Sequence, residues 1–83
     1  MTYQFIRSHI LENVSTECIT KFYQLDPDTR KNYQLKKDTF CLWILELIMK
    51  DGENKSSQIQ RNAAMYIVEI MGMLKKFKKE NNI

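Results

Sequence analysis

Glycine and proline are scarce in this sequence, which has two and one of them among its 83 residues. All-β folds of this size need many tight turns, and tight turns use these two residue types. The scarcity therefore favours helices joined by few loops. An apolar fraction of 43% with one Trp, four Tyr and four Phe is typical of a folded chain. We expect a single all-α domain over residues 1–83.

Long apolar runs are also missing. The longest unbroken one is Phe40–Leu45, whereas a helix that spans a bilayer needs about 20 residues. The first residues, MTYQFIR, lack the basic segment and apolar core of a signal peptide. Cys18 and Cys41 are the only cysteines, and both lie among apolar residues. We interpret them as buried thiols of a reducing compartment and expect a cytoplasmic protein without a transmembrane segment.

Motifs of known reactions are absent. The single histidine, His9, has no Ser or Cys beside it in sequence to act as a nucleophile. A zinc site commonly uses ligands at paired spacing, but His9, Cys18 and Cys41 each stand alone. Gly52 and Gly72 do not form a phosphate-binding loop. We therefore expect a non-enzymatic protein with no metal and no cofactor.

Apolar spacing and start or stop signals predict four or five helices in a compact bundle. A short strand over 3–6 is the alternative for the first segment, because aromatic and β-branched residues favour strands. Residues 39–50 are apolar nearly all round, which is typical of a central helix. The loop that follows is short, so we expect 39–50 and 57–79 to form a central antiparallel pair. The predicted helices cover 3–13, 15 or 16 to 25, 27–33, 39–50 and 57–80.

Capping residues set these boundaries. Ser15 or Thr16 is predicted to cap the second helix, and Asp26, followed by proline, the third. We predict N-caps also at Asp38 and at Ser56 or Ser57, with Tyr33 and Leu35 as anchors to the core. Gly52 is predicted to end the helix over 39–50 in the left-handed conformation. Glu46 is predicted to mark that helix's solvent edge, with a raised-pKa acid as the alternative.

The final segment, 57–80, is the longest predicted helix. At about 1.5 Å per residue it reaches about 35 Å, the width of a small domain. Its inward stripe recurs at steps of three and four residues: Ile59, Ala63, Ile67, Ile70, Leu74 and Phe77.

The net charge of +3 arises from the end of this segment. Lys75, Lys76, Lys78 and Lys79 face only Glu80 there, and the rest of the chain is balanced. Residues 75–83 are therefore a basic tail that we expect to fray. Lysines in a last helical turn complement the helix dipole, and they also attract anionic groups such as nucleic acid or acidic lipid.

Protein–protein binding is the function that the sequence favours. Methionine is flexible and common on surfaces that adapt to a partner, and Met65, Tyr66, Met71 and Met73 are predicted to lie on the flanks of the inward stripe. We predict that Met71, Met73 and Phe77 contact the partner and that the four lysines raise the association rate. Self-association through the same helix, as a symmetric dimer, is a second expectation.

A small DNA-binding regulator is the alternative. Ser57, Gln58, Arg61 and Asn62 open the last predicted helix with the side-chain types that contact bases and phosphates. A recognition helix places its first turns on the bases and its later residues in the core. The lysines, however, lie at the other end of the helix.

The chain as a whole, especially 26–48 and 58–73, resembles the lysis-inhibition accessory proteins of T-even-type bacteriophages, which are cytoplasmic antiholins. The resemblance implies an all-helical protein that binds the short cytoplasmic part of a holin and delays lysis. It assigns no functional residue to any position here.

Overall fold

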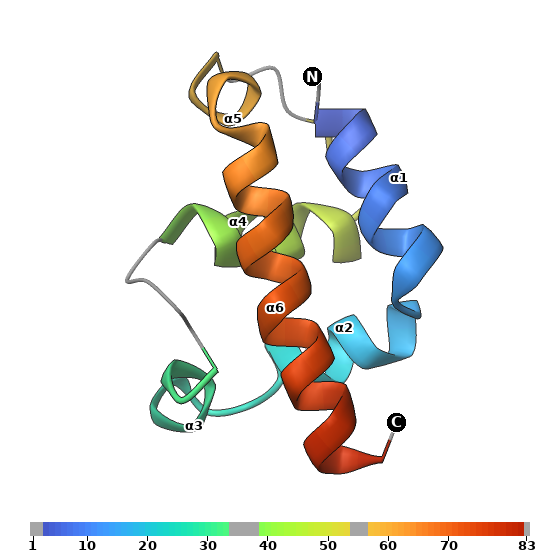
Figure 1. Ribbon diagram of the computed structural model, residues 1–83, viewed down its shortest axis with the longest axis vertical. Helices are drawn as coiled ribbons and strands as arrows, with labels where there is room; N and C mark the ends of the chain where they lie inside the picture. The colour runs from blue at the N-terminus through green and yellow to red at the C-terminus, as the bar shows by residue number, and fades with distance from the viewer. Residues whose placement is uncertain (1–2, 34–38, 54–56, 83) are drawn as a thin grey trace.

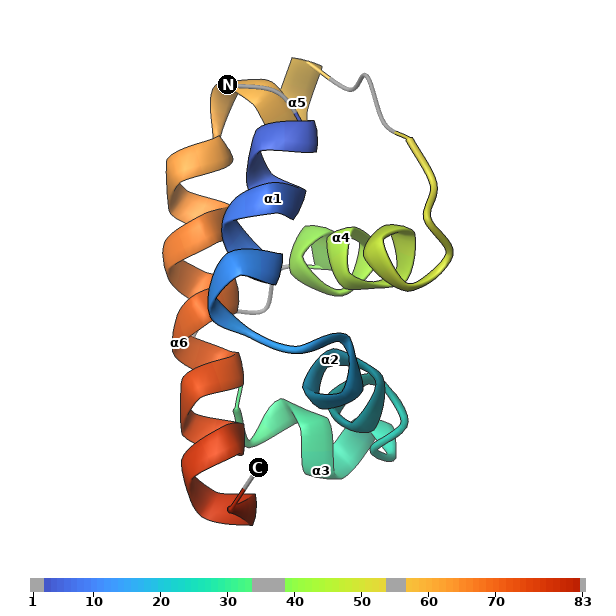
Figure 2. The same ribbon diagram turned by 90° about the vertical axis from the view of Figure 1, so that its right-hand side faces the viewer.

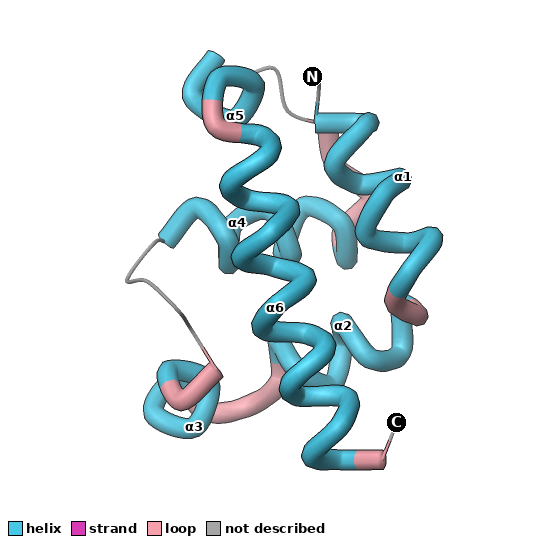
Figure 3. The backbone as a smooth tube through the Cα atoms, viewed as in Figure 1, coloured by secondary structure: helices cyan, strands magenta, loops and turns pink. Residues whose placement is uncertain are grey.

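The computed structural model describes residues 3–33, 39–53 and 57–82, and in these ranges every regular element is an α-helix (Figure 3). This confirms the predicted all-α fold and a helix, not a strand, at the start. The helices are α1 (Tyr3–Asn13), α2 (Thr16–Tyr23), α3 (Pro27–Lys31), α4 (Thr39–Met49), α5 (Ser57–Arg61) and α6 (Ala63–Asn81).

Helix α6 is the longest helix of the described chain, and α1, α2, α4 and α5 all contact it. Its 19 residues reach about 28 Å at the usual helical rise, most of the longest extent of the molecule, 33 Å. Helix α1 lies beside it and runs in the same direction, from top to bottom in Figure 1. Helices α2 and α4 lie behind α6 and run across it (Figures 1 and 2).

The predicted antiparallel pairing of 39–50 with 57–79 is therefore wrong. A short connection fixes which helices follow one another but not the angle at which they cross. Crossing α6 lets the short helix α4 bury side chains against α1, α2 and α6 together, which suits its apolar surface. The neighbour that does run along α6 is α1.

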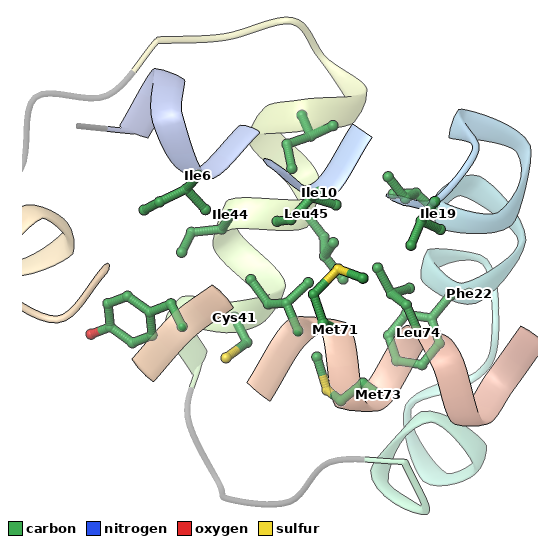
Figure 4. Packing of buried hydrophobic residues seen from close by; sticks show 14 of the residues in the cluster. Ile6, Ile10, Ile19, Phe22, Cys41, Ile44, Leu45, Met71, Met73 and Leu74 are labelled. Carbon is green, nitrogen blue, oxygen red and sulfur yellow. The ribbon is translucent and has the colours of Figure 1, made fainter. Parts of the chain in front are cut away.

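The core joins all of these helices except α3 (Figure 4). Near α3, three aromatic rings from α2, α6 and the residue after α3 pack edge to face. The ring centroid of Phe22 lies 5.9 Å from that of Tyr33 and 5.4 Å from that of Phe77, and those of Tyr33 and Phe77 are 5.6 Å apart. Tyr33, which follows α3, is thus the anchor that the sequence predicted, and it ties α3 to α2 and α6.

Two predicted N-caps are present. The Ser15 hydroxyl accepts a hydrogen bond from the backbone N–H of Cys18 at 3.1 Å. The Asp26 carboxylate accepts hydrogen bonds from the Thr29 hydroxyl at 2.6 Å and from the Thr29 backbone N–H at 3.0 Å, and these two bonds hold the pKa of Asp26 below its usual value. Both helices that follow end two residues earlier than predicted, at Tyr23 and Lys31. The predictions for Asp38, Leu35 and Ser56 fall outside the described residues.

Loss of the Ser15 cap is expected to destabilise the protein. Ser15→Ala removes the acceptor for the Cys18 N–H, and such a loss costs about 1 kcal/mol. Urea unfolding followed by circular dichroism measures the change. Thr16→Ala, one residue later and also exposed, is the control and should change the free energy of unfolding by less than half as much. Equal effects of the two substitutions would contradict the assignment of the cap.

The predicted long final helix is interrupted at Asn62, a break that the sequence did not predict. Asn62 has φ −112° and ψ 20°, outside the helical region. Its side-chain Nδ2 and its backbone N–H both donate to the carbonyl of Gln58. Asparagine competes in this way for backbone groups and disturbs a helix interior. As a result α5 turns away from the axis of α6 (Figure 1), and α6 then continues to Asn81.

The end of α4 also differs from the prediction. Asp51, and not Gly52, has the left-handed conformation, with φ 53°. The Gly52 N–H donates to the Leu47 carbonyl and the Asp51 N–H to that of Ile48, the pair of bonds of a Schellman motif. Aspartate tolerates this conformation better than most residues. Here its carboxylate also pairs with Arg7 of α1 at 2.9 Å.

Candidate protein-interaction surface

One side of α6 is not covered by any other helix of the described chain (Figures 1 and 2). At 3.6 residues per turn, positions spaced by three, four and seven share this side. We call it the outer face of α6. It consists of Ala64, Met65, Val68, Gly72, Lys75 and Lys79, of which only Gly72 is partly buried.

The outer face is apolar in its first half and basic in its second. Val68 is 68% exposed, the most of any large apolar side chain described, and Met65 is 37% exposed. Lys75 and Lys79 follow two and three turns after Val68 and are exposed. They lie at the C-terminal end of α6, where the helix dipole favours positive charge.

Phe5 on α1, the helix beside α6, is a further exposed apolar side chain. It is 50% exposed and stacks on half-buried His9 one turn later, with ring centroids 6.4 Å apart.

The four predicted lysines are not on one face. Lys75 and Lys79 are on the outer face, but Lys76 turns toward α3: its Nζ donates to the Asn32 carbonyl at 3.3 Å and lies 5.6 Å from the centre of the Tyr33 ring. Lys78 is on the α2 flank, where its charge partly offsets the effect of burial, which raises the pKa of the Cys18 thiol. Two of the four predicted lysines, Lys75 and Lys79, thus lie on the outer face.

The expectation that Met71, Met73 and Phe77 form an exposed surface is wrong. They are only 7%, 2% and 3% exposed, and both methionines lie among the buried side chains of Figure 4. The exposed lysines do not locate the outer face from the sequence. Val68 and Gly72 stand seven residues before Lys75 and Lys79, but buried Glu69 and Met71 stand seven before Lys76 and Lys78.

The residues of the DNA-binding alternative do not form one reading surface. Ser57 and Arg61 are exposed, but Gln58 and Asn62 are partly buried, and the Asn62 side chain is bonded to the Gln58 carbonyl. They belong to the five-residue α5, which is set apart from α6 by the break at Asn62. The lysines lie at the far end of α6.

Buried and titratable groups show no convergent site among the residues that the structure describes. Within these ranges no three His, Cys, Asp or Glu side chains could hold a metal ion together. Cys18 and Cys41 are both buried thiols that form no disulfide, as predicted. Glu46 is no raised-pKa acid, because a hydrogen bond from Lys50 lowers its pKa.

Among the residues that the structure describes, Glu69 is the buried acid, and the sequence did not predict it. It is 6% exposed, and its Oε2 accepts a hydrogen bond from the Cys41 thiol at 3.3 Å. This bond ties α6 to the start of α4. A glutamate between valine and isoleucine in the interior of a helix with an apolar stripe was the available signal.

Comparison with protein-family models, curated proteins and solved structures gives no match to this chain. In the described residues, no helix combines the length and the apolar character needed to cross a membrane. The exposed residues of α6 and α1 are therefore the basis for a functional proposal.

Proposed function

We propose that this protein is a non-enzymatic, cytoplasmic regulator that binds another protein in a stoichiometric complex through the outer face of α6. The observation that carries the proposal is the exposure of Val68 at the middle of a helix face that no described helix covers. Valine in that place contributes nothing to the core and has below-average helix propensity.

Apolar side chains scattered singly over a surface need no explanation, but gathered ones mark interaction sites. Met65 and Val68 are exposed neighbours one turn apart on the outer face of α6, and exposed Phe5 belongs to α1, the helix beside α6. An apolar cluster next to two lysines matches the common layout of a binding surface, in which an apolar centre holds the partner. The charges beside it raise the association rate.

A short amphipathic helix is the kind of segment that such a face holds. The resemblance to lysis-inhibition accessory proteins supplies one candidate, the cytoplasmic segment of a holin. Under this proposal the protein would delay lysis by occupying that segment.

The test is affinity capture from the native host at two salt concentrations, with Val68→Asp compared with wild type. We expect wild-type protein to retain one partner in about equal molar amount and Val68→Asp to lose it by more than tenfold, because a buried unpaired carboxylate opposes docking. A gel shift with duplex DNA at low salt tests the DNA-binding alternative in parallel.

A matched pair of methionine substitutions controls for general surface effects. Met65 and Met49 are 37% and 39% exposed, but Met49 ends α4, on the side of the molecule away from the outer face (Figure 2). Met65→Gln should weaken capture, whereas Met49→Gln should leave it unchanged. Equal retention of the partner by wild type, Val68→Asp and Met65→Gln would refute the proposed surface.

A further inference from the structure

The order of charge and apolar surface along α6 carries information about what binds there. Met65 and Val68 occupy the first half of the outer face, and Lys75 and Lys79 occupy the second. We propose that the partner segment is an amphipathic helix with acidic residues in its N-terminal half and apolar residues in its C-terminal half. It docks antiparallel to α6. This inference rests on the proposed function and adds the chemistry and direction of the partner.

Acidic residues in the partner follow from the charges of the outer face. Lys75 and Lys79 are one turn apart and exposed, and the outer face contains no carboxylate. Glu80 turns to the α3 flank, where it hydrogen-bonds with Tyr33 and raises the pKa of that hydroxyl. Docking an apolar segment without acids would leave both lysines beside a dry interface with no partner, which costs free energy.

A second copy of this chain lacks that complement. In an antiparallel pair of outer faces, the lysines of each α6 would meet the other's first half, which has no acid; Arg61, just before it, is basic. In a parallel pair the lysines would meet each other. The charge pattern therefore favours a different, acidic protein segment over a homodimer.

The direction follows from helix dipoles. The C-terminal end of α6 bears the negative end of its dipole together with Lys78 and Lys79 in its last turn. Acidic residues are favoured in the first turns of a helix, at the positive end of its dipole. An antiparallel partner brings its own acidic first turns opposite Lys75 and Lys79 and its apolar turns opposite Val68 and Met65. The face from Ala64 to Lys79 spans about 23 Å, so about four turns of partner helix match it.

The experiment uses two synthetic peptides of about 16 residues and identical composition, each held helical by a hydrocarbon staple on its solvent face. In the first peptide a block of four glutamates precedes the leucine face, and in the second the block follows it. Fluorescence anisotropy with the full chain at low and moderate salt gives the dissociation constants. We expect the acid-first peptide to bind at least tenfold more tightly, and its advantage to shrink as salt rises.

Two double variants with equal net charge are the matched controls. Lys75→Glu with Lys79→Glu reverses charge on the outer face and should abolish the preference for the acid-first peptide. Lys76→Glu with Lys78→Glu reverses it on the flanks of the same helix and should keep the preference. If the Lys75→Glu, Lys79→Glu variant still prefers the acid-first peptide, the preference comes from the peptides alone. That result would overturn the inference.

A nitroxide label at the acidic end of the peptide reports the direction itself. We expect it to broaden the amide signals of residues 75–79 and to spare those of 64–68. The opposite pattern, or equal binding of both peptides that still requires Val68, overturns the inference but leaves the proposed function standing. A third outcome also overturns the inference. Neither peptide binds, but the chain associates with itself or binds phosphatidylglycerol vesicles, and Val68→Asp abolishes that binding. Failure of Val68→Asp to affect any binding refutes the proposed function itself.

Discussion

Phe22→Ala is expected to lower the free energy of unfolding by about 3–5 kcal/mol. Phe22 is fully buried, and its ring packs edge to face on those of Tyr33 and Phe77. The substitution removes the apolar area of the ring, leaves a cavity where α2, α3 and α6 meet, and also removes two aromatic contacts. A domain of 83 residues has about 4–12 kcal/mol of stability in total, so this single change takes a large share of it.

Phe5→Ala is the matched control for Phe22→Ala, since it deletes the same side chain from a surface position that is 50% exposed. It should cost less than about 1 kcal/mol, because about half of its surface is already in water. Urea or thermal unfolding of both variants measures the difference. Similar losses in the two variants would show that Phe22 is not the centre of the aromatic cluster.

Met73→Asp is expected to unfold the protein. Met73 is 2% exposed, and a carboxylate there would be charged and unpaired in the core. Burying such a group costs more than about 4 kcal/mol, which is comparable to the whole stability of the domain. Far-ultraviolet circular dichroism at 25 °C should show the loss of helical signal, and analytical gel filtration should show expansion or aggregation.

Met65→Asp distinguishes a core effect from an effect of acidic substitution in α6. Met65 is in the same helix but exposed on the outer face, so this variant should keep the wild-type helical signal and melt within a few degrees of wild type. A folded Met73→Asp variant would mean that the side chain at 73 reaches solvent, and the face assignment of α6 would then be wrong.

Local features of the sequence predicted local structure well. Hydrogen-bonding side chains at Ser15 and Asp26 cap the helices that they were expected to cap, because a cap depends only on residues three positions apart. The break at Asn62 was missed, because asparagine inside a helical pattern signals only a modest loss of propensity. Its bonds to the Gln58 carbonyl decide the outcome.

The candidate surface shows why a stripe of apolar residues is ambiguous. A helix with apolar residues on several sides leaves open which side faces the core. The sequence-based prediction placed Met71 and Met73 on an exposed side, whereas both are buried. Helix α6 is covered on two flanks as well as behind, by α1, α2 and α4 together, so its buried sector is wide and takes in both methionines. Only the neighbours of a helix fix the width of that sector.

The sequence by itself determined that this protein is all-α, roughly where its helices begin and end, and that both cysteines are buried, since these follow from residue spacing and capping. The crossing of α4 over α6, the burial of Met71 and Met73 and the exposure of Val68 were decided by tertiary structure. The reason is physical. Short-range backbone and capping interactions set helix boundaries, whereas the side of each helix that becomes buried depends on the shapes of segments distant in sequence that pack against it.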